Sequence, residues 1–305
     1  MRRLSIGLPV YNGERYLAEA LTALLSQTYA DFELIIADNA STDETESIAR
    51  FFAAKDQRVR YVRHSRNIGV NRNFQSVLDL AGGELFRWAA ADDLCAPTAI
   101  ERCVRMLDAN PSCVLAYTKT RLIDDHGAPV QDYDDGLHLQ DELPSHRFSE
   151  CSSRLRLCNA LYGVMRISAL RAAGGIGVFV GSDIVLLLGL TLYGTFCEVP
   201  ERLFYRRFHP EASSSKRGFE LQQFYDPDAR RSPLARETRH LWELWRATLH
   251  APIRASEKWS ILIQLLRRAR GNRDVVASEL YNHMSATIKR FFRLAHNGQA
   301  RMGQR

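Results

Sequence analysis

Short apolar runs alternate with segments of helical periodicity over the first 118 residues. Residues 4–10 form a continuous apolar run, which predicts a buried strand, and the leucines in residues 14–27 recur at helical spacing. Further strands are expected at 33–38, 59–62, 84–91 and 113–118, with helices at 41–52, 71–80 and 97–110 between them. Strands that alternate with helices predict an α/β fold, with a mostly parallel sheet between two helical layers.

The second half of the chain has a less regular pattern. Residues 121–144 are acidic and irregular, an apolar segment at 161–173 ends at paired glycines, and a strand at 196–208 is expected to be interrupted near Pro200. Helical patterning resumes beyond Pro233 and reaches about residue 295. Two helix starts have recognisable chemistry: Ser41 and Glu44 have the form of a capping box, and Ser182 is expected to cap a helix at 183–193.

Composition narrows the class of protein. The chain has 305 residues, of which 46% are hydrophobic and 25% charged, so a disordered or fibrous protein is excluded. No apolar run of about 18 residues is present to span a membrane, and the apolar run at the N-terminus is too short for a signal peptide. We therefore expect a cytoplasmic protein, either free or peripheral on the cytoplasmic face of the membrane. Six cysteines without a CxxC pair are expected to be buried thiols.

Charge is distributed unevenly along the chain. Residues 230–305 hold sixteen Lys and Arg against five Asp and Glu, a net +11, which leaves −5 for the rest of a chain whose total is +6. The basic segment also carries tryptophans and leucines at helical spacing. It could pack on the rest of the chain or on a second copy in a homodimer, or it could lie on an anionic membrane surface. Nothing else in the sequence supports nucleic-acid binding.

Acidic residues occupy the ends of two expected strands. Asp38 ends the second strand, and Asp92 and Asp93 end the fourth, so their carboxylates should meet at the ligand-binding edge of a parallel sheet. Carboxylates there can share a hard cation such as Mn²⁺ or Mg²⁺ with a substrate diphosphate. Alternatively, the adjacent acids only begin a turn before Pro97. No GxGxxG or Walker-type glycine loop is present, which argues against dinucleotide dehydrogenases and P-loop enzymes.

Five short motifs, in order, carry a resemblance to a known family. They are Pro9-Val10-Tyr11-Asn12, the Asp38-to-Asp43 segment Asp-Asn-Ala-Ser-Thr-Asp, Asn67-Ile68-Gly69, Asp92-Asp93, and Leu24-to-Tyr29 with its following strand. Over residues 4–209 the chain resembles family 2 glycosyltransferases of the GT-A fold, a Rossmann-like sheet sandwiched by helices. The resemblance implies a catalytic domain at 1–229, with a nucleotide-binding half at 1–118 and an acceptor half at 119–229. A basic helical extension at 230–305 would follow.

The resemblance also assigns roles to individual residues. It implies that Pro9, Tyr11, Asp38, Asn67 and Asp92 contact the base, ribose or sugar of a nucleotide-diphospho-sugar donor, that Asp93 ligates the metal, and that Arg72 lies at the diphosphate. Asp183, after Gly181 at a helix start, would be the general base, although an acid there could simply favour the helix dipole. Arg206 and Arg207 would contact the diphosphate and His209 the metal, with a lid near residues 213–218; a plain surface strand is the alternative.

The function expected from these residues is metal-dependent transfer of a hexosyl or related sugar to a hydroxyl of a glycan or lipid-linked acceptor, with inversion. The family association suggests cell-envelope glycan biosynthesis. Two alternatives remain: a catalytically silent nucleotide-binding or scaffold protein that works through its basic tail, and, with less support, a nucleotidyltransferase. The acids in the irregular loop are expected to form a solvated surface. They are Asp124, Asp125, Asp132, Asp134 and Asp135.

Overall fold

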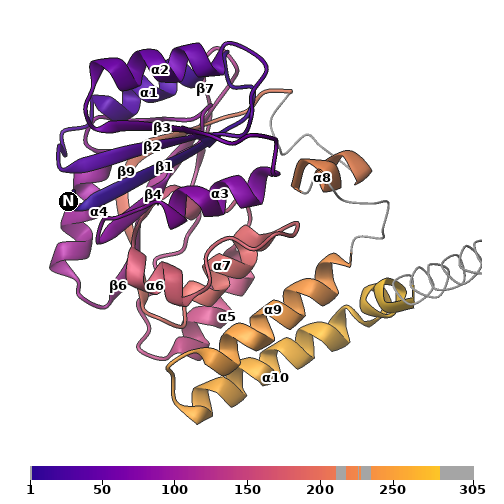
Figure 1. Cartoon of the computed structure of the whole chain (residues 1–305). Helices are drawn as coiled ribbons and strands as arrows, with labels where there is room; N and C mark the ends of the chain where they lie inside the picture. Colours follow the sequence, from indigo (N-terminus) through magenta and orange to yellow (C-terminus); the bar gives the residue numbers. More distant parts are fainter. Residues whose placement is uncertain (1, 211–217, 226, 228–234, 282–305) are drawn as a thin grey trace, which may run out of the picture.

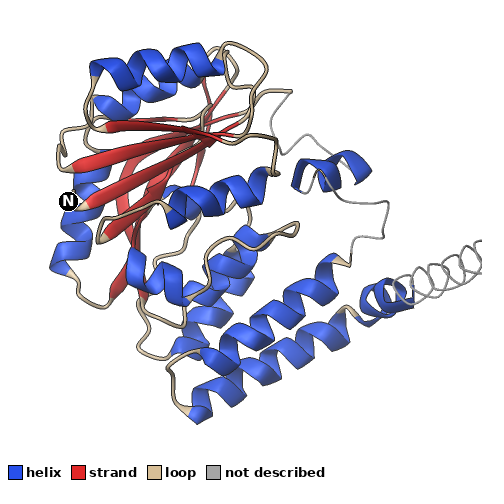
Figure 2. Cartoon of the chain, in the orientation of Figure 1, coloured by secondary structure: helices blue, strands red, loops and turns tan. Residues whose placement is uncertain are grey.

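The computed structural model describes residues 2–210, 218–225, 227 and 235–281 as one mixed α/β sheet with helices on both faces (Figures 1 and 2). Its strands are β1 (Leu4–Val10), β2 (Phe32–Asp38), β3 (Val59–Arg63), β4 (Leu85–Trp88), β5 (Leu94–Cys95), β6 (Cys113–Ile123), β7 (Pro129–Tyr133), β8 (Val164–Arg166) and β9 (Thr195–Arg207). Its helices are α1 (Leu17–Leu25), α2 (Thr45–Lys55), α3 (Val70–Asp79), α4 (Ala99–Ala109), α5 (Pro144–Arg154), the 3-10 turn η1 (Asn159–Tyr162), α6 (Ile167–Ala172), α7 (Ser182–Leu190), α8 (Gly218–Tyr225), α9 (Arg236–His250) and α10 (Ala255–Gly271).

The sheet has the order β3-β2-β1-β4-β8-β6-β9-β5, and β7 pairs with β6. The amino-terminal strands β1 to β4 are parallel, β6 and β9 are parallel, and β8 joins the two groups by antiparallel pairing on both sides. The predicted sandwich of a sheet between helices is confirmed. Because β1, β2 and β4 run the same way, their carboxyl ends meet at one edge, the side on which α8 lies in Figure 1.

Alternation along the strands explains why both faces are covered. In β2, Leu34 and Ile36 enter the core under α1, α2 and α4, whereas Ile35 and Ala37 enter the opposite core with α3, α6 and α7. A strand with period-two side chains that are apolar on both faces must be buried on both faces. Gly7 of β1 adds a steric condition, since a Cβ there would lie 2.5 Å from Val77 of α3. The glycine therefore lets α3 approach the sheet.

Several local predictions need correction. The irregular segment after residue 118 is partly regular, because β6 continues to Ile123 and forms a hairpin with β7. The expected interruption near Pro200 takes the form of a bulge: β9 is one continuous strand, but its pairing with β6 passes from Val199 to Arg202 and skips Pro200 and Glu201. Ser41 does not cap α2; its Oγ accepts the backbone N–H of Asn12 at 2.9 Å. Ser182 likewise makes no cap at α7.

The α9–α10 hairpin packs on α7. Leu244 of α9 and Ile261 and Leu265 of α10 are buried in the same cluster as the leucines of α7. The hairpin therefore shares a core with the sheet rather than standing apart. The expected helix beyond residue 281, the Ser232-Pro233 boundary and the serines of the expected lid lie outside the described residues. No helix in the described ranges is both long enough and apolar enough to cross a membrane. All six cysteines are buried free thiols, as predicted.

Candidate functional site

A cavity of about 540 Å³ lies at the carboxyl edge of the sheet, under α8. Its wall is assembled from β1, the segments after β2 and β4, the start of α3, η1, α7 and the end of β9. Most of the residues predicted for the site line it. They are Pro9, Tyr11, Asn67, Asp92, Asp93, Asp183, Arg206, Arg207 and His209. The structure therefore brings together side chains that lie up to 200 residues apart in the sequence.

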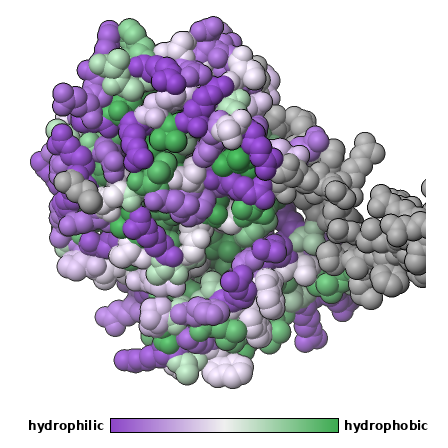
Figure 3. Space-filling model, viewed as in Figure 1, coloured by the Kyte–Doolittle hydropathy of each residue, from purple (hydrophilic) through white to green (hydrophobic). Residues whose placement is uncertain are grey.

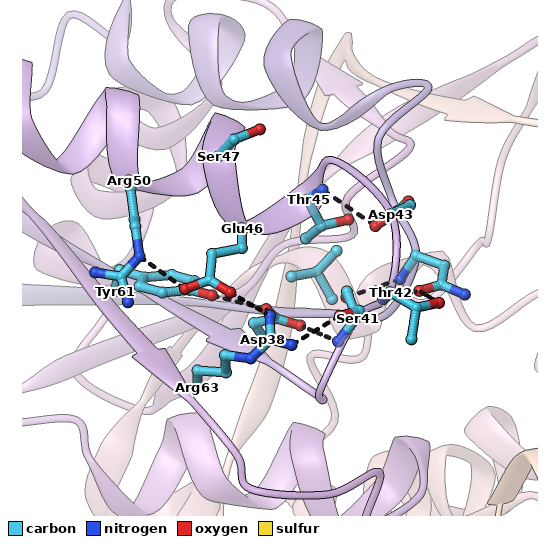
Figure 4. Close-up of polar contacts among 12 residues, drawn as sticks. Asp38, Ser41, Thr42, Asp43, Thr45, Glu46, Ser47, Arg50, Tyr61 and Arg63 are labelled. Carbon is cyan, nitrogen blue, oxygen red and sulfur yellow. Dashed lines mark hydrogen bonds and ion pairs between the residues drawn. The ribbon is translucent and has the colours of Figure 1, made fainter.

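Asp38 and Arg72 are not among the residues that line the cavity. Asp38 is fully buried, and its carboxylate is surrounded by protein donors (Figure 4). Its Oδ2 accepts from the Tyr61 hydroxyl and from Arg63 Nη1, each at 2.7 Å, and its Oδ1 accepts from the Ser41 backbone N–H at 2.8 Å. Burial and the bond to Asp38 raise the pKa of Tyr61 to about 12. Asp38 thus fixes the loop after β2 instead of projecting into the cavity.

Asn39, the next residue, lines the cavity in its place. Its Nδ2 donates to Asn67 Oδ1 at 2.9 Å, and its Oδ1 accepts the backbone N–H of Ile68 at 2.8 Å. The backbone N–H of Gly69 donates to the same Asn67 oxygen at 2.8 Å. The two amides therefore form one fixed unit at this wall. Sequence reasoning missed Asn39, although the alternation of a strand end, which sends successive residues to opposite sides, could have identified it.

Arg207 holds Asp92 and Asp93 in place. Its backbone N–H donates to Asp93 Oδ1 at 2.8 Å, and its Nε donates to the Asp92 carbonyl oxygen at 2.8 Å. The guanidinium is nearly fully buried, over the Tyr16 ring and 2.8 Å from Glu19 Oε2. Arg207 thus contacts protein groups on several sides. Burial, and to a lesser extent the neighbouring Asp92 charge, raise the pKa of Asp93 to about 8.

His209 follows β9 and faces the same pair of acids. Its Nε2 lies 3.0 Å from Asp92 Oδ2, and its ring is 5.1 Å from that of Tyr16. Its Nδ1 is buried and makes no hydrogen bond to the described residues. Among the residues that the structure places, no group of three or more His, Cys, Asp or Glu side chains is arranged to hold a metal ion. Asp93 and His209 nevertheless offer oxygen and imidazole donors that diphosphate oxygens could complete.

Arg206 and Asp183 also line the cavity. Arg206 Nη1 donates to the Leu157 carbonyl and to Asn159 Oδ1, each at 2.6 Å, so that its guanidinium is held at the wall. Asp183 lies in the first turn of α7, which begins after Gly181 in a left-handed conformation (φ +80°). Burial, with a smaller contribution from Asp183, raises the pKa of Tyr225 on α8 to about 12. Asp183 therefore shares its corner of the cavity with α8.

The acidic loop is less solvated than predicted. Asp132 and Asp134 form ion pairs along the β6–β7 hairpin with Arg121, Arg202 and Lys119. Asp135 is 5% exposed, and its Oδ2 has no hydrogen-bond partner among the described residues. Burial raises the pKa of Asp135 to about 6. The solvated interpretation of Asp135 was wrong, because the chain turns inward after β7 and nothing in the local sequence marks that turn.

Comparison with known proteins finds sequence relatives that match about half or less of this chain. The family described as Glycosyl transferase family 2 matches residues 5–151. An uncharacterised glycosyltransferase of Methanocaldococcus jannaschii is 26% identical over 149 residues, which cover 48% of this chain and 51% of that protein. An uncharacterised protein of Sinorhizobium fredii is 35% identical over 117 residues, 38% of this chain and 13% of that protein. The chain thus spans about half or less of the length of these relatives.

Solved structures share the fold at low sequence identity. Staphylococcus aureus TarS 1-349 in complex with UDP superposes with a TM-score of 0.62 at 17% identity, over 88% of this chain and 71% of that chain. The mannosyltransferase PcManGT of Pyrobaculum calidifontis, in complex with GDP-Man and Mn²⁺, gives a TM-score of 0.52 at 15% identity over 94% and 86%. At this identity the likeness concerns the fold, which is GT-A. Over residues 5–151, a little under half of its length, the chain matches glycosyl transferase family 2.

Proposed function

We propose that this protein transfers a sugar from a nucleotide-diphospho-sugar to an acceptor hydroxyl, with a divalent cation and with inversion at the anomeric carbon. The observation that carries the proposal is the placing of three kinds of group around one cavity. Tyr11 and the asparagine pair lie on one wall, Asp92, Asp93 and His209 on another, and Asp183 on the acceptor side. A donor that spans them would present its base, its diphosphate and its sugar in that order.

The base would stack on Tyr11, which is 46% exposed and lines the cavity. Asn39 and Asn67 would recognise polar edges of the base, and Pro9 would border it. Asp92 would approach the ribose or the sugar. Asp38 supports this wall from beneath, because its bond to the Ser41 backbone holds the loop that carries Asn39.

Asp93 and His209 would hold Mn²⁺ or Mg²⁺ together with the donor diphosphate. When bound, such a cation stabilises the negative charge of the departing nucleoside diphosphate. Arg206 would reach the phosphates, since its anchored guanidinium keeps donors in a fixed orientation. Arg207 would act mainly by holding Asp92 and Asp93. Arg72, outside the cavity wall, would reach the diphosphate only if the start of α3 moved.

Asp183 would accept the proton of the acceptor hydroxyl as the hydroxyl oxygen attacks the anomeric carbon. The bond from that carbon to the diphosphate oxygen breaks on the opposite face, and the electron pair leaves with the nucleoside diphosphate. Displacement from the far side inverts the anomeric centre. A carboxylate in the first turn of a helix is also favoured by the helix dipole.

The acceptor is proposed to be a glycan or a lipid-linked glycan of the cell envelope, reached from the cytoplasmic side. The α9–α10 hairpin exposes Trp242, Trp259 and Leu266, which are 57%, 66% and 57% exposed. Hydrophobic and hydrophilic side chains mix at the surface in the lower part of Figure 3. Such a surface suits an anionic membrane or a second copy of the chain. Binding to a membrane would bring the protein close to a lipid-linked acceptor, whereas binding to a second copy would form a dimer.

Thermal unfolding with UDP, GDP, dTDP and CDP, each with and without Mn²⁺, tests the donor site. A ligand at about 100 times its Kd adds about 2.7 kcal/mol and should raise the midpoint by a few degrees. Stabilisation by one nucleotide only when metal is present supports the proposal and identifies the donor. Transfer assays with the matching nucleotide-sugars follow. Stabilisation without any sugar transfer would favour a silent nucleotide-binding protein or scaffold instead.

A further inference from the structure

The loop that leads into α7 is held from the donor half of the chain. Asn71, in the first turn of α3, is 5% exposed and sends its Nδ2 into this loop. That nitrogen lies 2.6 Å from the Gly177 carbonyl oxygen, 2.9 Å from that of Phe179 and 3.0 Å from Ser182 Oγ. One buried amide therefore ties three points of the loop to the start of α3, which follows directly after the Asn67-to-Gly69 segment. Asp183 follows directly after the last of these points.

The C-terminal hairpin holds the same loop from the opposite side. His240 of α9 is 2% exposed, and its Nε2 lies 2.8 Å from the Val180 carbonyl oxygen. A carbonyl only accepts, so Nε2 carries the hydrogen. Burial lowers the pKa of His240, which keeps the ring neutral at pH 7. The contact is thus a neutral imidazole N–H donating to a loop carbonyl.

The His240 ring also packs against the turn at the start of α7. A Cβ on Gly181 would lie 2.6 Å from both Cε1 and Nε2 of His240, closer than side-chain carbons come. Gly181 has φ +80°, a conformation that glycine adopts without strain. Glycine is therefore required here for two reasons, the backbone turn and the close approach of the ring. Asp183 is two residues further on, so the contact between His240 and Gly181 fixes the position of the first turn of α7, which carries Asp183.

The position of His240 is itself fixed by the hairpin. Leu244, one turn later on α9, is buried in the core that also holds Leu186 and Leu187 of α7. Glu237, one turn earlier, accepts from Arg268 Nε of α10 at 2.7 Å. Figure 1 shows α9 lying beside α7, with α10 along the other side of α9. The ring is therefore carried on a rigid element and not on a free arm.

We propose that His240 is a positioning residue for the reaction, and that the C-terminal hairpin is part of the catalytic architecture because it clamps the turn that aims Asp183. The inference rests on the proposed function, since His240 acts through the proposed base. Asn71 holds the turn from the donor side and His240 from the acceptor side. A displacement of about 1 Å at a reacting group can lower a rate by about 100-fold. Loss of the contact between His240 and the loop should therefore lower kcat for sugar transfer and leave the affinity for the donor unchanged.

The test compares H240A with H240Q, whose amide nitrogen can still donate to Val180, and with H250A as a matched control. His250 ends the same helix, is exposed, and contacts only its own helix through Nδ1. Transfer kinetics are measured with the nucleotide-sugar and acceptor identified for the wild type. We expect kcat to fall about 10- to 100-fold in H240A, with KM for the donor within about twofold. H240Q should recover part of the loss, and H250A should match the wild type.

A second pair of variants separates positioning from a general structural effect. In the D183N background, H240A should cause less than about a twofold further loss, because the group that it positions is already gone. An equal loss in both backgrounds overturns the proposal, and so does an unchanged kcat in folded H240A. If H240A does not fold, H240Q is compared with H240N, whose side-chain amide is too short to reach the Val180 carbonyl. Equal transfer rates of these two variants overturn the proposal. A wild type that transfers no sugar overturns the proposed function and the positioning role together.

Discussion

The backbone nitrogen of Arg207 donates to Asp93 Oδ1 at 2.8 Å, so the end of β9 is bonded to the segment after β4. These residues are 114 positions apart. The same arginine turns its side chain back to the Asp92 carbonyl and to Glu19. The sequence predicts that Arg207 contacts a phosphate, but in the structure its guanidinium holds the acidic wall of the cavity in place. The acids and the residue that orients them therefore come from segments that are more than 100 residues apart in the chain.

Replacing Arg207 with glutamine should therefore disturb folding and the acidic wall together. The guanidinium is 1% exposed, and breaking a buried charge pair costs about 3 to 5 kcal/mol, although the partly exposed Glu19 can be rehydrated. We expect a loss of about 2 to 4 kcal/mol in the free energy of unfolding and weaker Mn²⁺-dependent stabilisation by the nucleotide. Urea titration measures the first and thermal shift the second. Arg102→Gln, which breaks an exposed pair with Glu201, should change stability by less than about 1 kcal/mol.

Asp183→Asn should abolish most transfer while it leaves nucleotide binding intact. The amide keeps the shape of the carboxylate but cannot accept the acceptor's proton. We expect a fall in kcat of about 100-fold or more. The thermal shift with nucleotide and metal should equal that of the wild type. A variant that transfers at a near wild-type rate shows that another group is the base.

Asp38 and Asn39 should respond to substitution in opposite ways. Asp38→Asn removes the buried charge that faces Arg63 and Tyr61, and should lower the unfolding free energy by about 2 to 4 kcal/mol. Asn39→Ala should lower stability less but raise the Kd for the nucleotide by about tenfold, because it removes a group of the cavity wall. Titration calorimetry and thermal unfolding of both variants measure the two effects. The reverse ranking would return the direct donor contact to Asp38.

Asp135 makes stability depend on pH. Its pKa is about 6 in the folded chain and about 3.9 in an unfolded one, so the folded state holds the proton more tightly. While the carboxyl is protonated in both states, below about pH 4, its contribution to the free energy of unfolding is fully present. As pH rises through 6 the buried carboxyl ionises, and about 3 kcal/mol of that free energy is lost. Asp135→Asn lacks that loss. The variant should therefore gain in melting temperature relative to the wild type between pH 4.5 and pH 7.5. A constant difference would contradict a pKa raised by burial of this carboxyl, whose Oδ1 accepts only the Asn159 backbone N–H among the described contacts.

The exposed face of the C-terminal hairpin can be tested with vesicles. Co-sedimentation with vesicles that contain anionic lipid should retain the wild type at low salt and release it at high salt. W259E and L266E should lower the bound fraction several-fold, while vesicles of neutral lipid should bind little of any form. A protein that ignores both vesicles but sediments as a dimer, which the same substitutions dissociate, would assign the face to a second copy.

The sequence by itself determined the alternation of strands and helices in the first half, because apolar periodicity is a local property. From the ends of parallel strands it predicted that Asp92 and Asp93 face one edge, and the family resemblance implied that Asn67 and Asp183 join them there. Most of the side chains proposed from the sequence line the cavity for that reason.

Tertiary structure alone decided which protein groups the candidate side chains contact. Asp38 is enclosed by Arg63 and Tyr61 from β3 while Asn39 faces outward, and Arg207 turns inward to hold Asp92 and Asp93. Asp135 is buried by a turn that no local motif marks, and His240 meets the loop before α7 from 60 residues away. These outcomes depend on contacts between distant segments, and the free energy of such contacts is set by packing, which residue type and spacing do not encode.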